Sequence, residues 1–260
     1  MINLTIGIPV YEMNGMGVDY LSFLLDRLNV QTVFPFEILI SDNSTDKKIE
    51  EFVINNDSKI KIRYIRNAGP KDPCTNLNNL IKNSKSEYIK FIFQDDFPFS
   101  NDLISKTIKA IEKNPSNNWF ICGSNNTTDN KKFYNYVKPY FNNKIYLGKN
   151  TLGSPSVLTV KNSKELLLFD NRFIWLLDCA YYHLLNKKFG PPVIIDEVLI
   201  TCRVHSDQLT GVLNDTKKIK EVFLAIKIFN KSFFKFYRFI EVFFSHLLNK
   251  LKVNVKRTLN

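Results

Sequence analysis

Two adjacent carboxylates follow an apolar run in the segment Phe93-Gln94-Asp95-Asp96-Phe97. Like charges this close raise each other's pKa, so the pair is costly unless another group shares its charge. A divalent cation would do so, because carboxylate oxygens suit magnesium and manganese. The nearby aromatic side chains argue against simple exposure to solvent, but two solvated acids that stabilise the start of a helix are the alternative. The pair therefore predicts a metal site.

Asp178 is the candidate catalytic base. It lies in 173–185 (FIWLLDCAYYHLL), which predicts a helix. Apolar neighbours would bury the carboxyl and raise its pKa towards the range in which a base accepts a proton from a hydroxyl. The alternative is an acid on the solvent face of an amphipathic helix.

The elements that must position these residues form an alternating pattern of strands and helices. Segments with helical spacing of apolar residues follow the first strands, at 18–28, 49–53, 77–81 and 103–111. The pattern predicts an α/β fold with a mainly parallel, Rossmann-like sheet flanked by helices. Short apolar runs predict strands at 4–10, 36–41, 60–64, 88–93, 119–122, 156–160 and 193–204.

Polar clusters fall where the first, second and fourth predicted strands end: Tyr11-Glu12, Asp42 and Gln94-Asp95-Asp96. Ligands of such sheets bind at the carboxyl ends of strands, near a switch in strand order. Turn residues also gather there, so a single cluster alone would favour a plain turn. Three clusters converging on one edge predict a binding site.

The motifs resemble the family 2 glycosyltransferases, and most closely the bacterial members that build surface polysaccharides such as O-antigen and capsule. The resemblance covers residues 3–212 and implies the GT-A fold, a nucleotide-sugar donor and a divalent metal, manganese or magnesium. The motifs that carry it occur in the family's order: IPVYE (8–12), EILISDNSTD (37–46), RNAGP (66–70), Asn76-x-Asn78, SEYIKFIFQDD (86–96) and RVHSDQLT (203–210).

The resemblance also implies roles for single residues. Asp95 would hold the ribose or share the metal, Asp96 would bind the metal, and His205 would complete the metal or diphosphate site. The family usually has another acid two positions before Asp95, where this chain has Phe93. Either Asp95 or Asp96 is then the main ligand. The residues implied for the nucleotide are Pro9, Tyr11, Glu12, Asp42 (facing the nucleobase), Ser44 beside it, and Asn76.

The acceptor side follows from the same resemblance. Gly153-Ser154 matches the loop that brings backbone amides near the sugar, with a plain turn as the alternative. Asp178 matches the family's base, which acts with inversion at the sugar carbon. Lys71 and Arg203 are long cationic donors suited to diphosphate oxygens, although each alone is also typical of a solvated surface charge.

Charge and composition limit the partners. The net charge is +11, but 216–260 carries +9 of it, so the first 215 residues are close to neutral and argue against nucleic acid. The four cysteines lie far apart, as expected of reduced thiols in a cytoplasmic protein. The chain opens without a secretory signal and lacks the ~18 consecutive apolar residues of a spanning helix.

We expect a catalytic domain at 1–213 and a basic, Phe-rich amphipathic helical tail at 214–260. Its apolar residues recur in steps of three and four, and its lysines lie on roughly the opposite side. Such a helix suits the anionic inner face of the cell membrane, which makes the protein peripheral there. The alternative is packing on the catalytic domain or on a second subunit of a homo-oligomer. The apolar stripe comprises Phe229, Phe233, Phe236, Ile240, Phe243, Leu247 and Leu251.

The sequence thus predicts an inverting, metal-dependent glycosyltransferase that moves a sugar from a nucleotide diphosphate, with UDP favoured over dTDP, to a hydroxyl of a lipid-linked glycan. One alternative is a non-catalytic scaffold of the same fold in a membrane-associated assembly complex, for which Phe93 is the support. A sugar-phosphate nucleotidyltransferase ranks lower, because the loop YEMNGMG (11–17) has no basic residue to hold a triphosphate.

Overall fold

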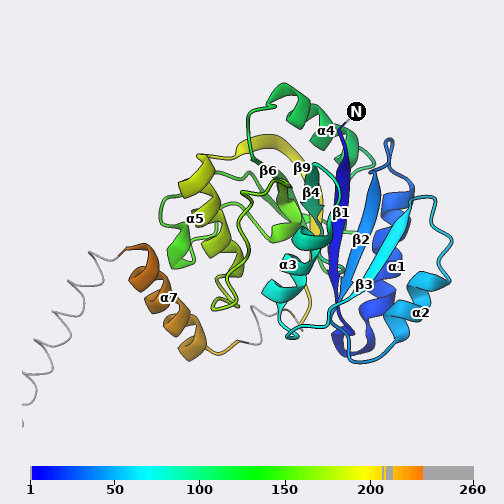
Figure 1. The fold of residues 1–260 in the computed structure, drawn as a ribbon, viewed down its shortest axis with the longest axis horizontal. Helices are drawn as coiled ribbons and strands as arrows, with labels where there is room; N and C mark the ends of the chain where they lie inside the picture. Colours follow the sequence, from blue (N-terminus) through cyan, green and yellow to red (C-terminus); the bar gives the residue numbers. More distant parts are fainter. Residues whose placement is uncertain (1, 207, 209–212, 231–260) are drawn as a thin grey trace, which may run out of the picture.

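The computed structural model describes residues 2–206, 208 and 213–230, which form a nine-stranded mixed sheet with flanking helices (Figure 1). The strand order is β3-β2-β1-β4-β8-β6-β9-β5, and β7 pairs with β6. The strands are β1 (Leu4–Val10), β2 (Glu37–Asp42), β3 (Ile62–Arg66), β4 (Tyr88–Phe91), β5 (Phe97–Pro98), β6 (Trp119–Thr127), β7 (Tyr134–Val137), β8 (Leu158–Lys161) and β9 (Val193–Arg203).

The helices follow the predicted apolar spacing. In the first helix, Leu21, Leu25 and Leu28 are fully or almost fully buried on one face. The third begins where Asp72 accepts a hydrogen bond from the Thr75 N–H, with a proline at the first helical position. The helices are α1 (Gly17–Asn29), α2 (Lys48–Ile54), α3 (Pro73–Asn83), α4 (Leu103–Lys113), α5 (Leu177–Phe189) and α7 (Asp215–Phe229), with short 3₁₀ turns η1 (Met13–Gly15), η2 (Ile145–Leu147) and η3 (Pro155–Val157).

The first half of the sheet is parallel, as the alternating sequence pattern predicts. β1 pairs in parallel with β2 and β4, and β2 with β3. Every residue of β2 and β4 is buried, which is typical of strands covered on both faces. The other half is mixed: β8 returns antiparallel between β4 and β6, while β9 runs parallel to β6. The α/β prediction is confirmed.

The strand order reverses at β1. β2 and β3 extend the sheet to one side, and β4 continues it on the other. The register pairs Val10 with Asp42 and Gly7 with Phe91, so β1, β2 and β4 end at the same edge. This is the switch point at which ligands of open α/β sheets bind. The predicted convergence of three polar strand ends is therefore confirmed.

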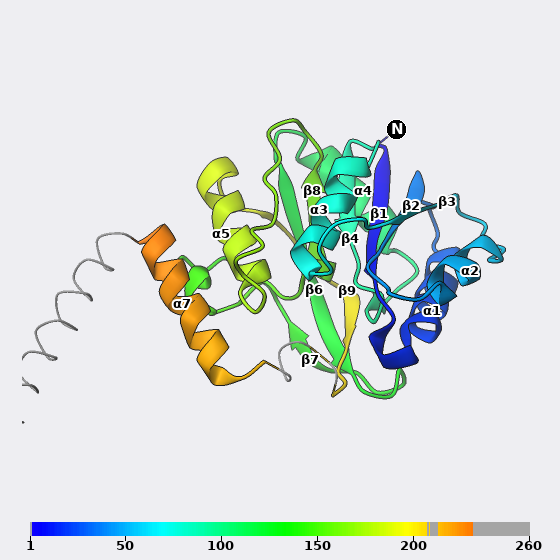
Figure 2. The ribbon, with the colours of Figure 1, turned by 60° about the horizontal axis from the view of Figure 1, so that its bottom comes forward.

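Helix α7 lies beside α5, on the side of the molecule away from α1 and α2 (Figures 1 and 2). The Phe229 ring stacks on Phe173 with a 6.0 Å separation of the ring centroids, and Ala225 is fully buried. The first part of the predicted tail thus packs on the α/β domain. The rest of the predicted apolar stripe, from Phe233 onwards, lies outside the described residues. Among the helices that the structure describes, none combines the length and apolarity that crossing a bilayer requires.

Candidate functional site

A cavity of about 480 Å³ opens at the edge where β1, β2 and β4 end. One wall comes from the loops after these strands, and the opposite wall from the segment that leads into α5. Its lining includes both polar and apolar side chains. The lining residues predicted from the sequence are Pro9, Tyr11, Glu12, Lys71, Asn76, Asp95, Asp96, Ser154, Asp178 and His205.

Gln94 joins the ends of β1 and β4. Its side-chain oxygen accepts a hydrogen bond from the Tyr11 N–H at 2.6 Å, and its amide group donates to the Tyr11 carbonyl at 2.9 Å. The same amide donates to the carbonyl of Gly17 at 3.3 Å. A buried side chain that pairs both polar groups of one residue fixes the distance between two loops. Gln94 thereby holds the acid pair against the loop after β1.

The Asp96 carboxylate is 4% exposed, and its hydrogen-bond donors are the Arg203 backbone N–H and the hydroxyls of Ser154 and Ser156. Its Oδ1 accepts from the Arg203 backbone N–H at 3.2 Å, and its Oδ2 accepts from the Ser154 hydroxyl at 3.3 Å. Burial raises the pKa of Asp96 to about 7, and the adjacent Asp95 charge adds to the rise. The free protein therefore holds this carboxylate at a cost near neutral pH.

Asp95 and His205, 110 residues apart in the chain, come together at this edge. The His205 Nε2 lies 3.0 Å from Asp95 Oδ2, and both side chains are largely buried. The imidazole also lies beside the Tyr20 ring, with 5.6 Å between the ring centroids. The structure thus places Asp95, Asp96 and His205 around one corner of the cavity.

This corner fits a divalent cation bound together with a ligand. Among the described residues, no group of three or more His, Cys, Asp or Glu side chains forms a ready metal cage. Magnesium and similar ions are commonly held by one or two carboxylates, with substrate phosphates and water as the remaining ligands. The cavity-lining pair Asp95 and Asp96 offers those oxygens, and the raised pKa of Asp96 shows that its charge is poorly compensated in the free protein.

Asp178 lies across the cavity, in the first turn of α5. Burial raises its pKa to about 6, and a hydrogen bond of 2.7 Å from the Asn150 amide opposes part of the rise. Asn150 also accepts from the N–H groups of Leu152 and Gly153, at 3.0 Å each. It is a positioning residue that the sequence prediction missed, because its partner Asp178 is 28 residues away.

The predicted nucleotide residues that reach the cavity are held in place by their neighbours. The Thr45 hydroxyl donates to Glu12 at 2.9 Å. The Asn76 amide donates to the carbonyl of Val10 at 3.1 Å, which ties α3 to the end of β1. The Lys71 ammonium donates to the carbonyl of Asn67 at 3.1 Å and lines the cavity.

Four predicted residues do not line the cavity. Asp42 is fully buried beneath it and accepts from the Tyr64 hydroxyl at 2.6 Å and the Arg66 guanidinium at 3.0 Å, so its contact with a nucleobase stays a prediction. Ser44 is buried beside it. Gly153 lies behind Ser154, where its φ of +110° suits glycine.

Arg203 is the fourth, and its guanidinium lies among aromatic rings, close enough to Asp95 and Asp96 to interact with their charges. It lies 4.4 Å from the centroid of the Tyr20 ring and 5.1 Å from that of Phe23. Its Nε donates to Asn130 at 3.0 Å. The Arg203 backbone N–H donates to Asp96, and a contact between its side chain and a diphosphate stays a prediction.

The apolar part of the lining was missed by the sequence prediction. Phe93 faces the cavity at the position where the family's additional acid is absent. Ile174, Trp175 and Leu177 form the wall on the α5 side. In a sequence, apolar residues that line a cavity cannot be distinguished from those of the core. The apolar wall of the cavity is therefore recognised only in the folded structure.

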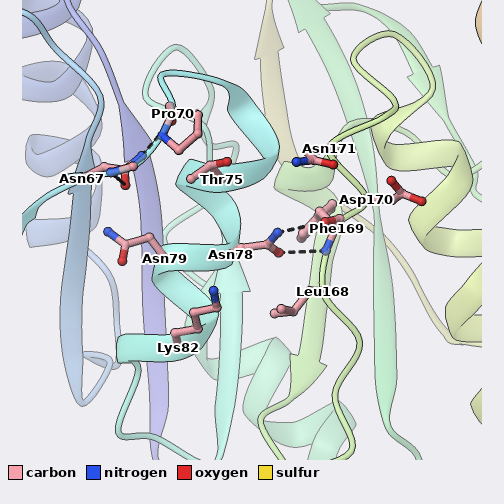
Figure 3. Close-up of a pocket in the computed structure, with 11 residues that line it drawn as sticks. Asn67, Pro70, Thr75, Asn78, Asn79, Lys82, Leu168, Phe169, Asp170 and Asn171 are labelled. Atoms are coloured by element: carbon pink, nitrogen blue, oxygen red, sulfur yellow. Dashed lines mark hydrogen bonds between the residues drawn. The ribbon is translucent and has the colours of Figure 1, made fainter.

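A second hollow, of about 520 Å³, lies on the outer side of α3 (Figure 3). Its polar lining is largely engaged in internal hydrogen bonds. The Asn78 amide donates to the Phe169 carbonyl at 2.8 Å, and its oxygen accepts from the Phe169 N–H at 2.7 Å. Asn67 donates to the carbonyl of Pro70 at 3.2 Å. The two Asn78–Phe169 bonds fasten the segment before α5 to α3, and the Asn67–Pro70 bond holds the loop before α3.

Comparison with known proteins agrees with this architecture. The family model described as Glycosyl transferase family 2 matches residues 5–160. An uncharacterised glycosyltransferase of Rickettsia typhi is 28% identical over 225 residues, which are 80% of this chain and 66% of the relative. One of Rickettsia conorii is 33% identical over 113 residues, which are 43% of this chain and 17% of the relative.

Two solved structures share the fold. S. aureus TarS 1–349 in complex with UDP-GlcNAc has a TM-score of 0.64 at 14% identity, and covers 86% of this chain and 66% of its own. The mannosyltransferase PcManGT of Pyrobaculum calidifontis, in complex with GDP-Man and Mn²⁺, has a TM-score of 0.57 at 13% identity and covers 86% and 63%. The chain thus spans about two thirds of the length of these proteins and of the R. typhi relative.

The buried charge of Asp96 predicts a pH-dependent stability in metal-free buffer. Its folded pKa of about 7 exceeds the ordinary 3.8, so ionisation destabilises the fold as the pH rises through this interval. Asp96→Asn should therefore raise the melting temperature by several degrees at pH 8, at about 2–4 °C per kcal/mol. The difference should shrink at pH 5, where the wild-type carboxyl is protonated.

Thermal unfolding in EDTA between pH 5 and pH 8 measures this effect. Asp57→Asn, which removes an exposed acid, is the matched control and should change little. An Asp96→Asn protein with the same pH dependence as the wild type would show that Asp96 is not held at a cost.

Proposed function

The chain belongs to glycosyl transferase family 2, and we propose that it transfers a sugar from a nucleotide diphosphate donor to an acceptor hydroxyl with inversion at the sugar carbon. One observation carries the proposal. The acid pair Asp95-Asp96 and the separate acid Asp178 line the same cavity, at the switch point of the sheet. The acid pair is suited to hold a metal-bound diphosphate, and Asp178 is suited to act as the base.

The donor half is the part next to the ends of β1 and β4. Pro9, Tyr11 and Glu12 would hold the nucleoside, with Asn76 nearby. Asp42 lies beneath this region and stays the candidate for the nucleobase. UDP is favoured from the sequence motifs, and TarS, which shares the fold, was solved with UDP-GlcNAc.

Asp96 and Asp95 would hold a manganese or magnesium ion, with His205 beside them. Such an ion supplies positive charge that stabilises the diphosphate leaving group. PcManGT, which also shares the fold, was solved with Mn²⁺. The Lys71 ammonium lines the same cavity and would add a second positive charge.

Asp178 would take the proton of the acceptor hydroxyl as the new bond forms. The Asn150 amide at 2.7 Å fixes the direction of its carboxyl oxygen. A pKa of about 6 leaves the group mainly ionised at neutral pH and still able to accept a proton. The Ser154 turn would lie between the acceptor and Asp96.

The acceptor we propose is a lipid-linked glycan of surface-polysaccharide synthesis, reached from the inner face of the membrane. Support comes from the basic, Phe-rich composition of residues 214–260 and from the outward face of α7. On that helix Ile219 and Phe223 are exposed beside Lys220 and Lys227. Apolar and cationic side chains together suit an anionic lipid surface.

Nucleotide and metal should stabilise the protein together. UDP with manganese at about 100 times its dissociation constant should add about 2.7 kcal/mol to the free energy of unfolding. The measurement is a thermal-shift titration with UDP, dTDP, GDP and CMP, each with and without manganese. Asp96→Ala should abolish the metal-dependent shift.

The same titration separates an enzyme from a scaffold. A scaffold of the same fold would show no metal-dependent shift with any nucleotide, and that result would contradict the donor site. A further titration with UTP tests the nucleotidyltransferase, which would prefer this triphosphate to UDP.

Replacement of the base should affect turnover but not donor binding. Asp178→Asn keeps the size of the side chain and should lower sugar transfer by about 10²–10⁴-fold. In the wild type, transfer should rise with pH through about 6, where the carboxyl ionises. Steady-state rates between pH 5 and pH 8 measure both effects, with UDP affinity as the control. A variant that keeps wild-type turnover would exclude Asp178 as the base.

A further inference from the structure

Helix α5 begins without a cap of its own. The residue before its first turn, Leu176, has no side chain that can accept a hydrogen bond from the free N–H groups of the helix start. The turn Ile174–Leu176 leads into this helix start with three N–H groups of its own, and its Ile174 and Trp175 line the cavity. Asp178 follows two residues later. The geometry of the acceptor side therefore depends on what satisfies this turn.

The acceptor for the N–H groups of this turn comes from α7. The Glu221 carboxylate accepts hydrogen bonds from the N–H groups of Trp175 and Leu176 at 2.9 Å each. It also accepts from the Ile174 N–H, at 3.1 Å to each carboxylate oxygen. Three consecutive N–H groups on one carboxylate are a strong, charge-assisted arrangement. A negative charge at the start of α5 is also favoured by the helix dipole.

Other contacts fix the same segment from both sides. The Phe173 ring stacks on Phe229 of α7, and the Phe173 carbonyl accepts from the Cys74 thiol of α3 at 3.2 Å. The Trp175 ring lies against Gly148, where an added Cβ would come within 2.9 Å of it. The indole thus has little room to move as long as the backbone of the turn is held.

We infer that Glu221 is a positioning residue for the acceptor half of the site. Helix α7 then belongs functionally to the catalytic domain. The carboxylate holds the turn Ile174–Leu176, and the turn sets Trp175 and the start of α5 that carries Asp178. This role rests on the proposed function.

The fluorescence of Trp175 reports on the conformation of the turn Ile174–Leu176. The chain has two tryptophans, and the other, Trp119, is fully buried in β6. The difference in emission between the wild type and Trp175→Phe therefore isolates the signal of Trp175. Quenching by acrylamide measures how far the indole is shielded from solvent.

Glu221→Ala should increase quenching of the Trp175 signal roughly twofold, since local opening exposes the turn. Glu221→Gln keeps the length and one acceptor oxygen, and should give an intermediate value. Asp215→Asn is the matched control, because it removes an acid from the same helix that pairs with Lys218 and does not touch the turn. If Glu221→Ala does not fold, Glu221→Gln decides by the same readouts.

Measurements of UDP affinity and of the rate of sugar transfer distinguish a loss of positioning from a general loss of the folded structure. In Glu221→Ala, affinity for UDP with manganese should stay within about twofold, while sugar transfer falls roughly ten- to hundredfold through misplaced groups. Unchanged Trp175 quenching, or loss of UDP affinity in parallel with turnover, would overturn the inference. If the wild type binds no nucleotide, the proposed function fails, whereas the quenching series still decides whether Glu221 holds the turn.

Discussion

The site depends on one electrostatic constraint, which is the charge of two adjacent carboxylates at a buried sheet edge. Asp96 is almost inaccessible, and it is held by neutral donors, the Ser154 hydroxyl and the Arg203 backbone N–H. Burial and Asp95 raise its pKa to about 7. A fold that keeps such a group near neutral pH bears a cost in stability, and a cation with a bound diphosphate would offset it. Gln94, which fastens the acid pair to the loop after β1, keeps this charge at the switch point of the sheet.

Much of this arrangement was predictable from the sequence, because it follows from local patterns. The apolar runs at 4–10, 36–41 and 88–93 match β1, β2 and β4 within a few residues. Since parallel strands end at one edge, the convergence of Tyr11, Glu12 and Asp95-Asp96 needed only the strand assignment. The boundary between a catalytic domain at 1–213 and a basic tail at 214–260 stays a prediction. Helix α7 packs against η2 and the Phe173 ring, and residues 231–260 lie outside the described residues.

What the sequence did not predict comes from tertiary contacts. The helix predicted over 173–185 begins instead at Leu177, and it is preceded by a turn in which the N–H groups of Ile174, Trp175 and Leu176 donate to the Glu221 carboxylate. The contacts of the Arg203 guanidinium with the Tyr20 and Phe23 rings were not predicted either, and its role towards a diphosphate stays a prediction. The sequence around Arg203, which lies two residues before His205, does not indicate where the arginine side chain points. The two sides of the cavity are thus organised differently: the side next to β1 and β4 by strand ends, and the side next to α5 by contacts with α7.

The central claim is that the Asp95-Asp96 corner binds a divalent cation together with a nucleotide diphosphate. Anomalous diffraction from crystals of the protein soaked with UDP and manganese tests it most directly. The account predicts one manganese peak within bonding distance of an Asp95 or Asp96 carboxylate oxygen and of the diphosphate. A nucleotide bound elsewhere, or a diphosphate in the cavity with manganese absent from this corner, would contradict it.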